Sequence, residues 1–397
     1  MIEKKSLRRP ISTFSAAIAI SLGLILVPVA AANAHTTIQS GRAAVKTAST
    51  NGASTTGAST TGASSSGAGT SGVNTTRATD DTDTTEAVDA DLEGPVGGAN
   101  APAPVREVNV STTAQLKAAL AAAAPGDRIT LADGRYLGKF VTSNSGTEAA
   151  PITLIGSRKA VLTTGSTRKG YGLHVTGEYW NLSGFTVTTA HKGIVLDAAS
   201  YSIIDGVDVG DIGQEAIHVR HSSSHVIVRN SLVHDTGTVS QAFGEGIYLG
   251  SSHKNWSKVM GSASLADQSD YAIVENNTIT NTAAEGIDVK EGTIGGQLLN
   301  NTFLNDAWSG KNSADSWVDV KGNGYLISGN RGSQTINDGF QVHKMMVGWG
   351  QRNTFENNSS TGVVPGYLVR IVWGSTDNVV TCAPSTATLG LTNIPCS

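Results

Sequence analysis

The fold is decided by a five-residue unit that recurs along the chain and is clearest as GIYLG at residues 246–250, GIDVK at 286–290 and WVDVK at 317–321. A residue that is usually small comes first, and apolar and variable residues then alternate. Further copies begin at Gly172, Gly193, Ala216, Gly339 and Gly366. Alternation with a period of two predicts a strand with one buried face. Copies spaced 21 to 40 residues apart, with insertions of variable length, indicate a solenoid whose loops project from one face.

A second recurring feature is an asparagine that follows a short apolar stretch in most copies, as at Asn230, Asn276, Asn300 and Asn330. Asparagine tolerates the left-handed backbone conformation, and its amide can bond to the same amide on the next coil. The sequence therefore predicts a ladder of stacked asparagines.

Both ends of the repeat array carry features that we expect to close it. Ser111 can cap a helix over residues 114–124, which Pro125 stops, and such a helix would cover the open end of a stack of strands. At the other end, Cys382 and Cys396 follow the last copy. In an exported protein these cysteines favour a disulfide over a catalytic thiol.

The first hundred residues differ from the rest in composition. Residues 1–34 have the basic start, apolar run and A-x-A end of a secretory signal, which we favour over a membrane anchor. Residues 35–104 are Ser/Thr/Gly/Ala repeats without apolar periodicity and are predicted to be a disordered linker. The folded domain is expected over 105–397, in a secreted, monomeric protein with no membrane span after signal cleavage.

Composition excludes two classes of function. The formal net charge of the 397 residues is −4, whereas a nucleic-acid-binding protein normally carries a basic excess. Two cysteines are too few for a Cys-rich zinc or iron–sulfur site.

The entry to the repeat array resembles a known family. PGDRITLADGRY at residues 125–136, with the predicted helix before it, and GTEAAPITLIG at 146–156 are similar to segments of pectate-lyase-like proteins, especially chondroitinase B and alginate lyases. The resemblance implies an all-β right-handed parallel β-helix with an N-terminal capping helix. It identifies the fold better than the activity, because this scaffold carries lyases, hydrolases, epimerases and inert adhesins.

Stacking the repeats places the variable positions in two outward columns. These columns are less polar at their N-terminal end and strongly polar in the middle. The first column contains His174, Val195, His218, Tyr248, Asp288, Asp319, Gln341 and Leu368. The second contains Thr176, Asp197, Arg220, Gly250, Lys290, Lys321, His343 and Arg370. Long insertions flank the polar middle, and a rigid sheet walled by loops is where function is expected.

Charged residues in this middle region form the candidate site. Asp288 and Asp319 are expected on adjacent coils beside Lys290 and Lys321, an arrangement that is either a salt-bridge lattice or a functional cluster. We assign catalysis to Lys290, Lys321 and His343, and substrate binding to Arg220, Tyr248, Gln341, Arg370 and Trp308. Trp256 and Trp308 lie in insertions, so both rings are expected to be exposed and able to contact sugar faces.

A third column of acids precedes the strands at Glu215, Glu245 and Glu285, with Asp338 at a related place. Burying three stacked glutamates would be costly, so we expect them on the bend at the rim of the site. This column is either a solvated turn ladder or an oxygen-rich site for a hard cation such as Ca²⁺. The candidate ligands are Glu245, Glu285, Asp288 and Asp319.

The family resemblance adds roles to two of these residues. Glu285 and Lys290 have the spacing found in chondroitinase-B-like lyases, where the glutamate helps bind calcium and the lysine is the base, and this implies the same roles here. The next coil has Lys321 where the family has an arginine, so the proton donor is left open. The GHG and RIK motifs of β-helix polygalacturonases are absent from the sequence.

Three hypotheses follow from the sequence. The first is a secreted lyase that cleaves a uronic-acid-containing polysaccharide by β-elimination. Its base would be Lys290, with a pKa lowered by the neighbouring Lys321. The second is a glycoside hydrolase that uses Asp288 and Asp319. The third is a non-catalytic glycan-binding protein of the cell surface.

Overall fold

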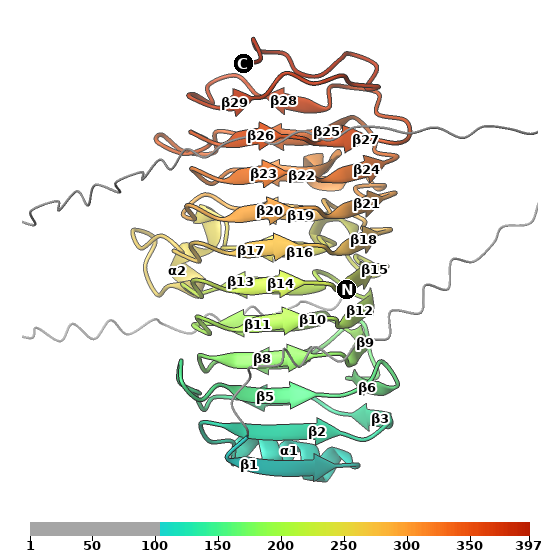
Figure 1. Cartoon of the computed structure of the whole chain (residues 1–397), viewed down its shortest axis with the longest axis vertical. Coiled ribbons are helices and arrows are strands. Elements are labelled where there is room, and N and C mark those ends of the chain that lie inside the picture. The colour runs from blue at the N-terminus through green and yellow to red at the C-terminus, as the bar shows by residue number, and fades with distance from the viewer. Residues whose placement is uncertain (1–103) are drawn as a thin grey trace, which may run out of the picture. The chain divides into compact units, whose positions relative to one another are not determined.

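The computed structural model describes residues 104–397, in which three parallel sheets wind into one solenoid (Figure 1). The predicted signal and nearly all of the predicted linker lie outside these residues. In nine successive coils a strand of sheet A is followed by one of sheet B and one of sheet C, and sheet A has one further strand at each end of the stack. The predicted β-solenoid is therefore confirmed. Within the described range, no helix is both long and apolar enough to cross a membrane.

The strands are short, and each pairs in parallel with its equivalent in the next coil. Sheet A consists of β1 (Arg106–Val110), β2 (Asp127–Leu131), β5 (Ile152–Ile155), β8 (Trp180–Ser183), β11 (Ile203–Asp205), β14 (Ile227–Arg229), β17 (Ile273–Glu275), β20 (Gln297–Leu299), β23 (Leu326–Ser328), β26 (Thr354–Glu356) and β29 (Val379–Val380). Sheet B consists of β3 (Gly134–Leu137), β6 (Ala160–Thr163), β9 (Thr186–Ala190), β12 (Asp208–Ile212), β15 (Leu232–His234), β18 (Thr278–Thr280), β21 (Thr302–Leu304), β24 (Arg331–Ser333) and β27 (Ser359–Ser360). Sheet C consists of β4 (Phe140–Thr142), β7 (Tyr171–Val175), β10 (Lys192–Asp197), β13 (Ile217–Arg220), β16 (Ile247–Leu249), β19 (Ile287–Val289), β22 (Ser316–Val320), β25 (Asp338–Val342) and β28 (Val369–Ile371).

Helical segments are confined to one end of the stack and to loops. They are α1 (Thr113–Ala121), α2 (Trp256–Val259) and the 3₁₀ turns η1 (Gln241–Phe243), η2 (His253–Asn255) and η3 (Lys311–Ser313). Helix α1 lies at the N-terminal end of the stack (Figure 1) and buries Leu116, Ala119 and Leu120. Its N-cap is Thr112 rather than the expected Ser111, because Thr112 completes a capping box with Gln115.

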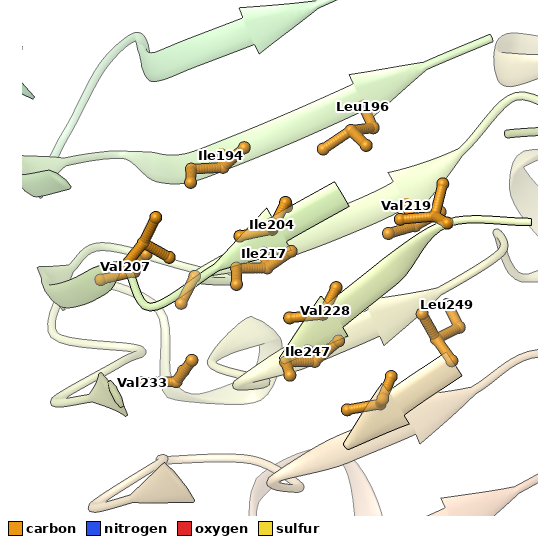
Figure 2. Close-up of a cluster of buried hydrophobic side chains, with 14 of the residues drawn as sticks. Ile194, Leu196, Ile204, Val207, Ile217, Val219, Val228, Val233, Ile247 and Leu249 are labelled. Carbon is orange, nitrogen blue, oxygen red and sulfur yellow. The ribbon is translucent and has the colours of Figure 1, made fainter. Parts of the chain in front are cut away.

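The core consists of apolar residues that stack on their equivalents in successive coils. On sheet C, Ile194 pairs with Ile217 and Ile217 with Ile247, and all three are fully buried. Figure 2 shows these residues facing Ile204 and Val228 of sheet A. The period-two pattern of the repeat thus fixes which face of each strand is buried.

The predicted asparagine ladder is present, and adjacent asparagines have different roles in it. One asparagine adopts the left-handed backbone conformation, and the next one forms the side-chain hydrogen bonds. Asn276 and Asn300 adopt the left-handed backbone at the corner between sheets A and B. The following residues turn inward, and each side-chain amide donates to the next side-chain oxygen at 3.0 Å, in the order Asn277, Asn301, Asn330 and Asn358. The same amides donate to backbone carbonyls, which satisfies these buried groups.

Two features of the C-terminal end bear on the sequence predictions. The disulfide between Cys382 and Cys396 is formed. The register expected for the last repeat is wrong, because Gln341 pairs with Arg370 rather than Leu368, which is fully buried. A shift of two residues keeps the same side chains facing the core, so the alternating pattern could not exclude it.

Candidate functional site

The polar cluster is built on the outer face of sheet C by β16, β19 and β22. Their register places Asp288 between Tyr248 and Asp319, as the repeat alignment predicts. These outward side chains were expected to be open to solvent, but they are buried. Asp288 is 1% exposed, Asp319 4% and Tyr248 8%. The site is therefore an enclosed polar cluster against the sheet.

The insertion after β16 packs back against a neighbouring coil. Trp256, expected to be exposed, is buried, and its indole nitrogen donates to the carbonyl of Ser251 at 2.9 Å. Asp267 anchors the far end of the insertion by accepting the backbone amides of His221 (3.0 Å) and Ser222 (2.8 Å). These contacts fix the insertion to neighbouring coils.

Two lysines and two aspartates alternate in a chain of ion pairs. Asp288 accepts Lys290 on one oxygen and Lys321 on the other, the latter at 2.7 Å. Lys321 also contacts Asp319 at 2.6 Å. The other oxygen of Asp319 lies 2.7 Å from Nδ1 of His343. All three predicted catalytic residues therefore belong to one connected network.

This network corrects the charge argument made for Lys290 from the sequence. Burial acts to lower its pKa, but the carboxylates of Asp288, Glu285 and Glu245 outweigh burial and raise it above the usual lysine value. The pKa of Lys321 is raised in the same way. Sequence reasoning placed the two lysines next to each other and underestimated how many acids face them.

The acid column lies on the bends that lead into sheet C, as predicted, but it is buried. Glu215, Glu245 and Glu285 are 5%, 4% and 6% exposed. Lys192, which sequence reasoning missed, contacts Glu215 at 2.5 Å and offsets its charge. Asp338 belongs to the same column two coils beyond Glu285, because it pairs with Ser316 of β22, which is level with Glu285.

Burial of the acid column is electrostatically unfavourable, and it raises the pKa of both Glu245 and Glu285. Burial raises the pKa of Glu285 to about 7, and the charge of Asp288 adds to the effect. Burial, together with the charges of Glu215 and Asp288, raises the pKa of Glu245 well above its ordinary value. One carboxylate oxygen of Glu245, Oε2, is buried without a hydrogen-bond partner.

Three of the four predicted metal ligands come together. One oxygen each from Glu245, Glu285 and Asp288 lies within 4.8 Å of the others. An all-oxygen donor set and the unpartnered Oε2 of Glu245 fit a hard cation such as Ca²⁺. Asp319 belongs instead to the ion pairs with Lys321 and His343.

Tyr248 links the lysine cluster to a histidine that sequence reasoning did not single out. Nζ of Lys290 lies 4.9 Å from the centre of the Tyr248 ring. The ring of His218 packs against that of Tyr248 in a T-shaped arrangement, with ring centres 4.4 Å apart, and its Nε2 donates to the carbonyl of Gly250 at 3.0 Å. Burial, followed by Lys192 and Arg220, lowers the pKa of His218, so this ring is neutral.

The remaining predicted substrate-binding residues are dispersed. Gln341 is buried and donates to Asp315 and Asp338, both at 2.8 Å. Arg370 is half-exposed beside Asp338, at 3.4 Å. Trp308 is 43% exposed and lines a separate hollow of about 310 Å³ at the corner between sheets B and C, together with Asp235, Thr236, Thr238, Asn281 and Asn305. Arg220 lies at the end of β13 and is held by Asp197.

Comparisons with known proteins agree with this architecture. Residues 100–246 match the family described as Pel9A-like, right handed beta helix region. An alginate lyase from Paenibacillus sp. str. FPU-7 is 38% identical with a TM-score of 0.67, and the match covers 72% of this chain and 97% of that chain. No curated protein sequence matches the chain.

Two more distant structures share the fold. Pectate lyase Pel9A is 16% identical with a TM-score of 0.52, covering 74% of this chain and 79% of its own. A GH136 lacto-N-biosidase from Eubacterium ramulus is 11% identical with a TM-score of 0.53, covering 70% of this chain and 60% of its own. Identities this low establish the fold alone.

Proposed function

The chain belongs to the right-handed parallel β-helix family that includes the Paenibacillus alginate lyase, and we therefore propose that it is a polysaccharide lyase. Its substrate is a uronic-acid-containing glycan, which it cleaves by β-elimination. The signal-like residues 1–34 support an exported enzyme. The observation that carries the proposal is the convergence of Lys290 and Lys321 on Asp288, next to the buried acids Glu245 and Glu285.

β-Elimination needs a base for the proton beside the carboxylate, a proton donor for the leaving oxygen, and positive charge to stabilise the enolate. We assign the base to Lys290. His343 is the best-placed donor because its side chain is 29% exposed, and Asp319 raises its pKa against the opposing effect of burial. Lys321 is 8% exposed and bridges two aspartates, so its role is to hold them in position.

Calcium fits the oxygen ligands Glu245, Glu285 and Asp288. When bound, it would supply positive charge that neutralises the sugar carboxylate and offsets the surrounding acids. Without added positive charge, the acids keep Lys290 protonated. The proposed base role therefore predicts activity that is lost on chelation and restored by Ca²⁺.

The ion pairs disfavour the hydrolase alternative. Both oxygens of Asp288 are engaged by lysines. Burial would raise the pKa of Asp319, but Lys321 and His343 outweigh it and lower that pKa below its usual range. An aspartate held in this way cannot serve as the protonated acid that glycoside hydrolysis requires.

The test is a panel of uronate polymers assayed for unsaturated ends, which absorb in the ultraviolet, and for new reducing ends. We expect unsaturated ends, and new reducing ends alone would instead indicate hydrolysis. Lys290→Ala should lower turnover at least about a hundredfold. Lys290→Arg separates two roles, because an arginine keeps the positive charge but cannot act as a base. Substantial activity in the arginine variant would exclude the base assignment.

A further inference from the structure

Arg220 lies in the same outward column as Lys290, with Gly250 between them. The amide of Gly250 donates to the carbonyl of Val219 at 2.7 Å, and the amide of Lys290 donates to the carbonyl of Leu249 at 2.9 Å. The three coils therefore follow one another without interruption. At about 4.8 Å per coil, Arg220 and Lys290 are about 10 Å apart along the stack.

The guanidinium of Arg220 is fixed by its neighbours. Nε donates to one oxygen of Asp197 at 2.5 Å and Nη2 donates to the other at 3.0 Å. His174 contacts Asp197 at 2.7 Å, and the ring of Tyr171 lies 5.9 Å from the guanidinium carbon. A side chain that is already ordered loses less entropy when a ligand binds.

Arg220 retains binding capacity after pairing with Asp197. A guanidinium has five N–H donors and can engage two carboxylates along different edges. The hydrogen bonds to Asp197 occupy Nε and Nη2, which leaves the Nη1 edge for a second anion. The side chain is 18% exposed, so this edge can be reached from outside.

Gly250 lies between the two cationic residues and is buried. Its φ of +79° disfavours any other residue, and an added Cβ would lie 2.6 Å from Cγ2 of Thr293. The coil between Arg220 and Lys290 therefore adds no charged side chain to this column. A sugar in a 1,4-linked chain advances by nearly the height of one coil.

We infer that Arg220 binds the carboxylate of a uronate two sugars away from the bond cleaved at Lys290. This inference rests on the proposed function and adds a distal subsite to it. Arg220 then selects acidic chains long enough to reach that subsite, while taking no part in bond cleavage.

The solenoid offers a matched control on a different sheet. Arg229 donates through Nε to Asp205 at 2.9 Å, and Asn230 donates to the same aspartate at 2.9 Å. This pair has the same chemistry but belongs to sheet A. If such pairs only stabilise the coils, substitutions at Arg220 and Arg229 should have the same consequences.

The experiment compares Arg220→Lys with Arg229→Lys, because lysine keeps the charge but cannot bridge two carboxylates in a fork. A second variant, Asp197→Asn with Arg220→Gln, removes both charges together and guards against misfolding from an unpaired aspartate. On long uronate chains we expect kcat/KM to fall roughly ten- to a hundredfold in both Arg220 variants, mainly through KM. On oligosaccharides too short to reach Arg220 they should match the wild type. Arg229→Lys should match it on all chain lengths.

An equal loss on short and long chains, or an equal effect of Arg229→Lys, would overturn the subsite. Failure of the proposed function is distinguishable, because the wild type would then form no unsaturated ends. In that event calorimetric titration of the wild type with a uronate hexasaccharide provides the test. Weaker binding by Arg220→Lys than by Arg229→Lys supports the subsite, and equal binding by the two rejects it.

Discussion

Two stacks of identical side chains are buried in this solenoid, and they differ sharply in how well they are satisfied. In the asparagine ladder each amide donates to the next side chain and to a backbone carbonyl, as Asn301 does to Asn330 and Val274. In the acid column Glu215 and Glu245 each have a buried oxygen without a partner. An amide both donates and accepts, whereas a carboxylate only accepts, so stacking suits the first and strains the second.

We propose that this difference separates a structural ladder from a functional one. The asparagine ladder satisfies buried backbone groups on successive coils. The charges of Glu215 and Glu285 raise the pKa of Glu245, and Glu245 and Glu285 surround Lys290 with negative charge. A costly arrangement beside a reactive lysine is expected where function outweighs stability.

The largest effect should come from neutralising the acid column. Glu245→Gln and Glu285→Gln should each lower lyase activity at least about a hundredfold. They should also raise the melting temperature of the calcium-free protein, because a buried charge is removed. Glu275→Gln on sheet A is the control and should change neither quantity. A lower melting temperature in both column variants would show that these glutamates stabilise the fold.

The converse substitution should damage the asparagine ladder. Asn301→Asp replaces two donated hydrogen bonds with a buried negative charge and should lower the free energy of unfolding by about 3 kcal/mol. Asn300→Asp changes the exposed neighbour and should cost far less. Denaturant unfolding of both variants measures the contrast, and equal losses would contradict the division of tasks between adjacent asparagines.

The acid column should also make stability depend on pH. The pKa of Glu285 is raised to about 7 in the folded protein, from 4.5 when unperturbed. The folded state therefore binds the proton more tightly, and its stability should fall as the pH rises through this window. We expect a loss of about 3 kcal/mol in calcium-free buffer. Glu285→Gln should flatten that part of the unfolding profile, and a profile unchanged by the substitution would rule out this origin.

A smaller pH effect should come from sheet B. His234 lies between Asp208 and Asp235, whose hydrogen bonds raise its pKa from 6.5 to about 9 against the opposing effect of burial. The stabilisation is complete below pH 6.5 and is lost as the pH rises through about 9. Partial exposure limits it to about 1 kcal/mol. Unfolding of His234→Gln should show a weaker alkaline dependence, with lyase activity unchanged at neutral pH.

The solenoid follows from the repeat pattern alone, because that pattern is local and recurs along the chain. A period of two fixes which side chains of each strand face the core, and the recurrence of the unit fixes which strands pair. The pattern therefore predicts that Asp288 lies beside Asp319, and the register of β19 and β22 confirms it. It failed for Leu368 and Arg370, where a shift of two residues leaves the pattern unchanged.

The surroundings of the reactive groups, in contrast, depend on tertiary packing. The pKa of a lysine responds to every charge within a few ångströms. For Lys290 these charges come from Asp288 on the same strand, from Glu285 on the bend before it and from Glu245 on the neighbouring coil. Burial depends in the same way on how insertions pack, as Trp256 shows. Neither the pKa of a side chain nor its burial follows the repeat pattern of the sequence. Each depends on residues that the chain brings together from several coils.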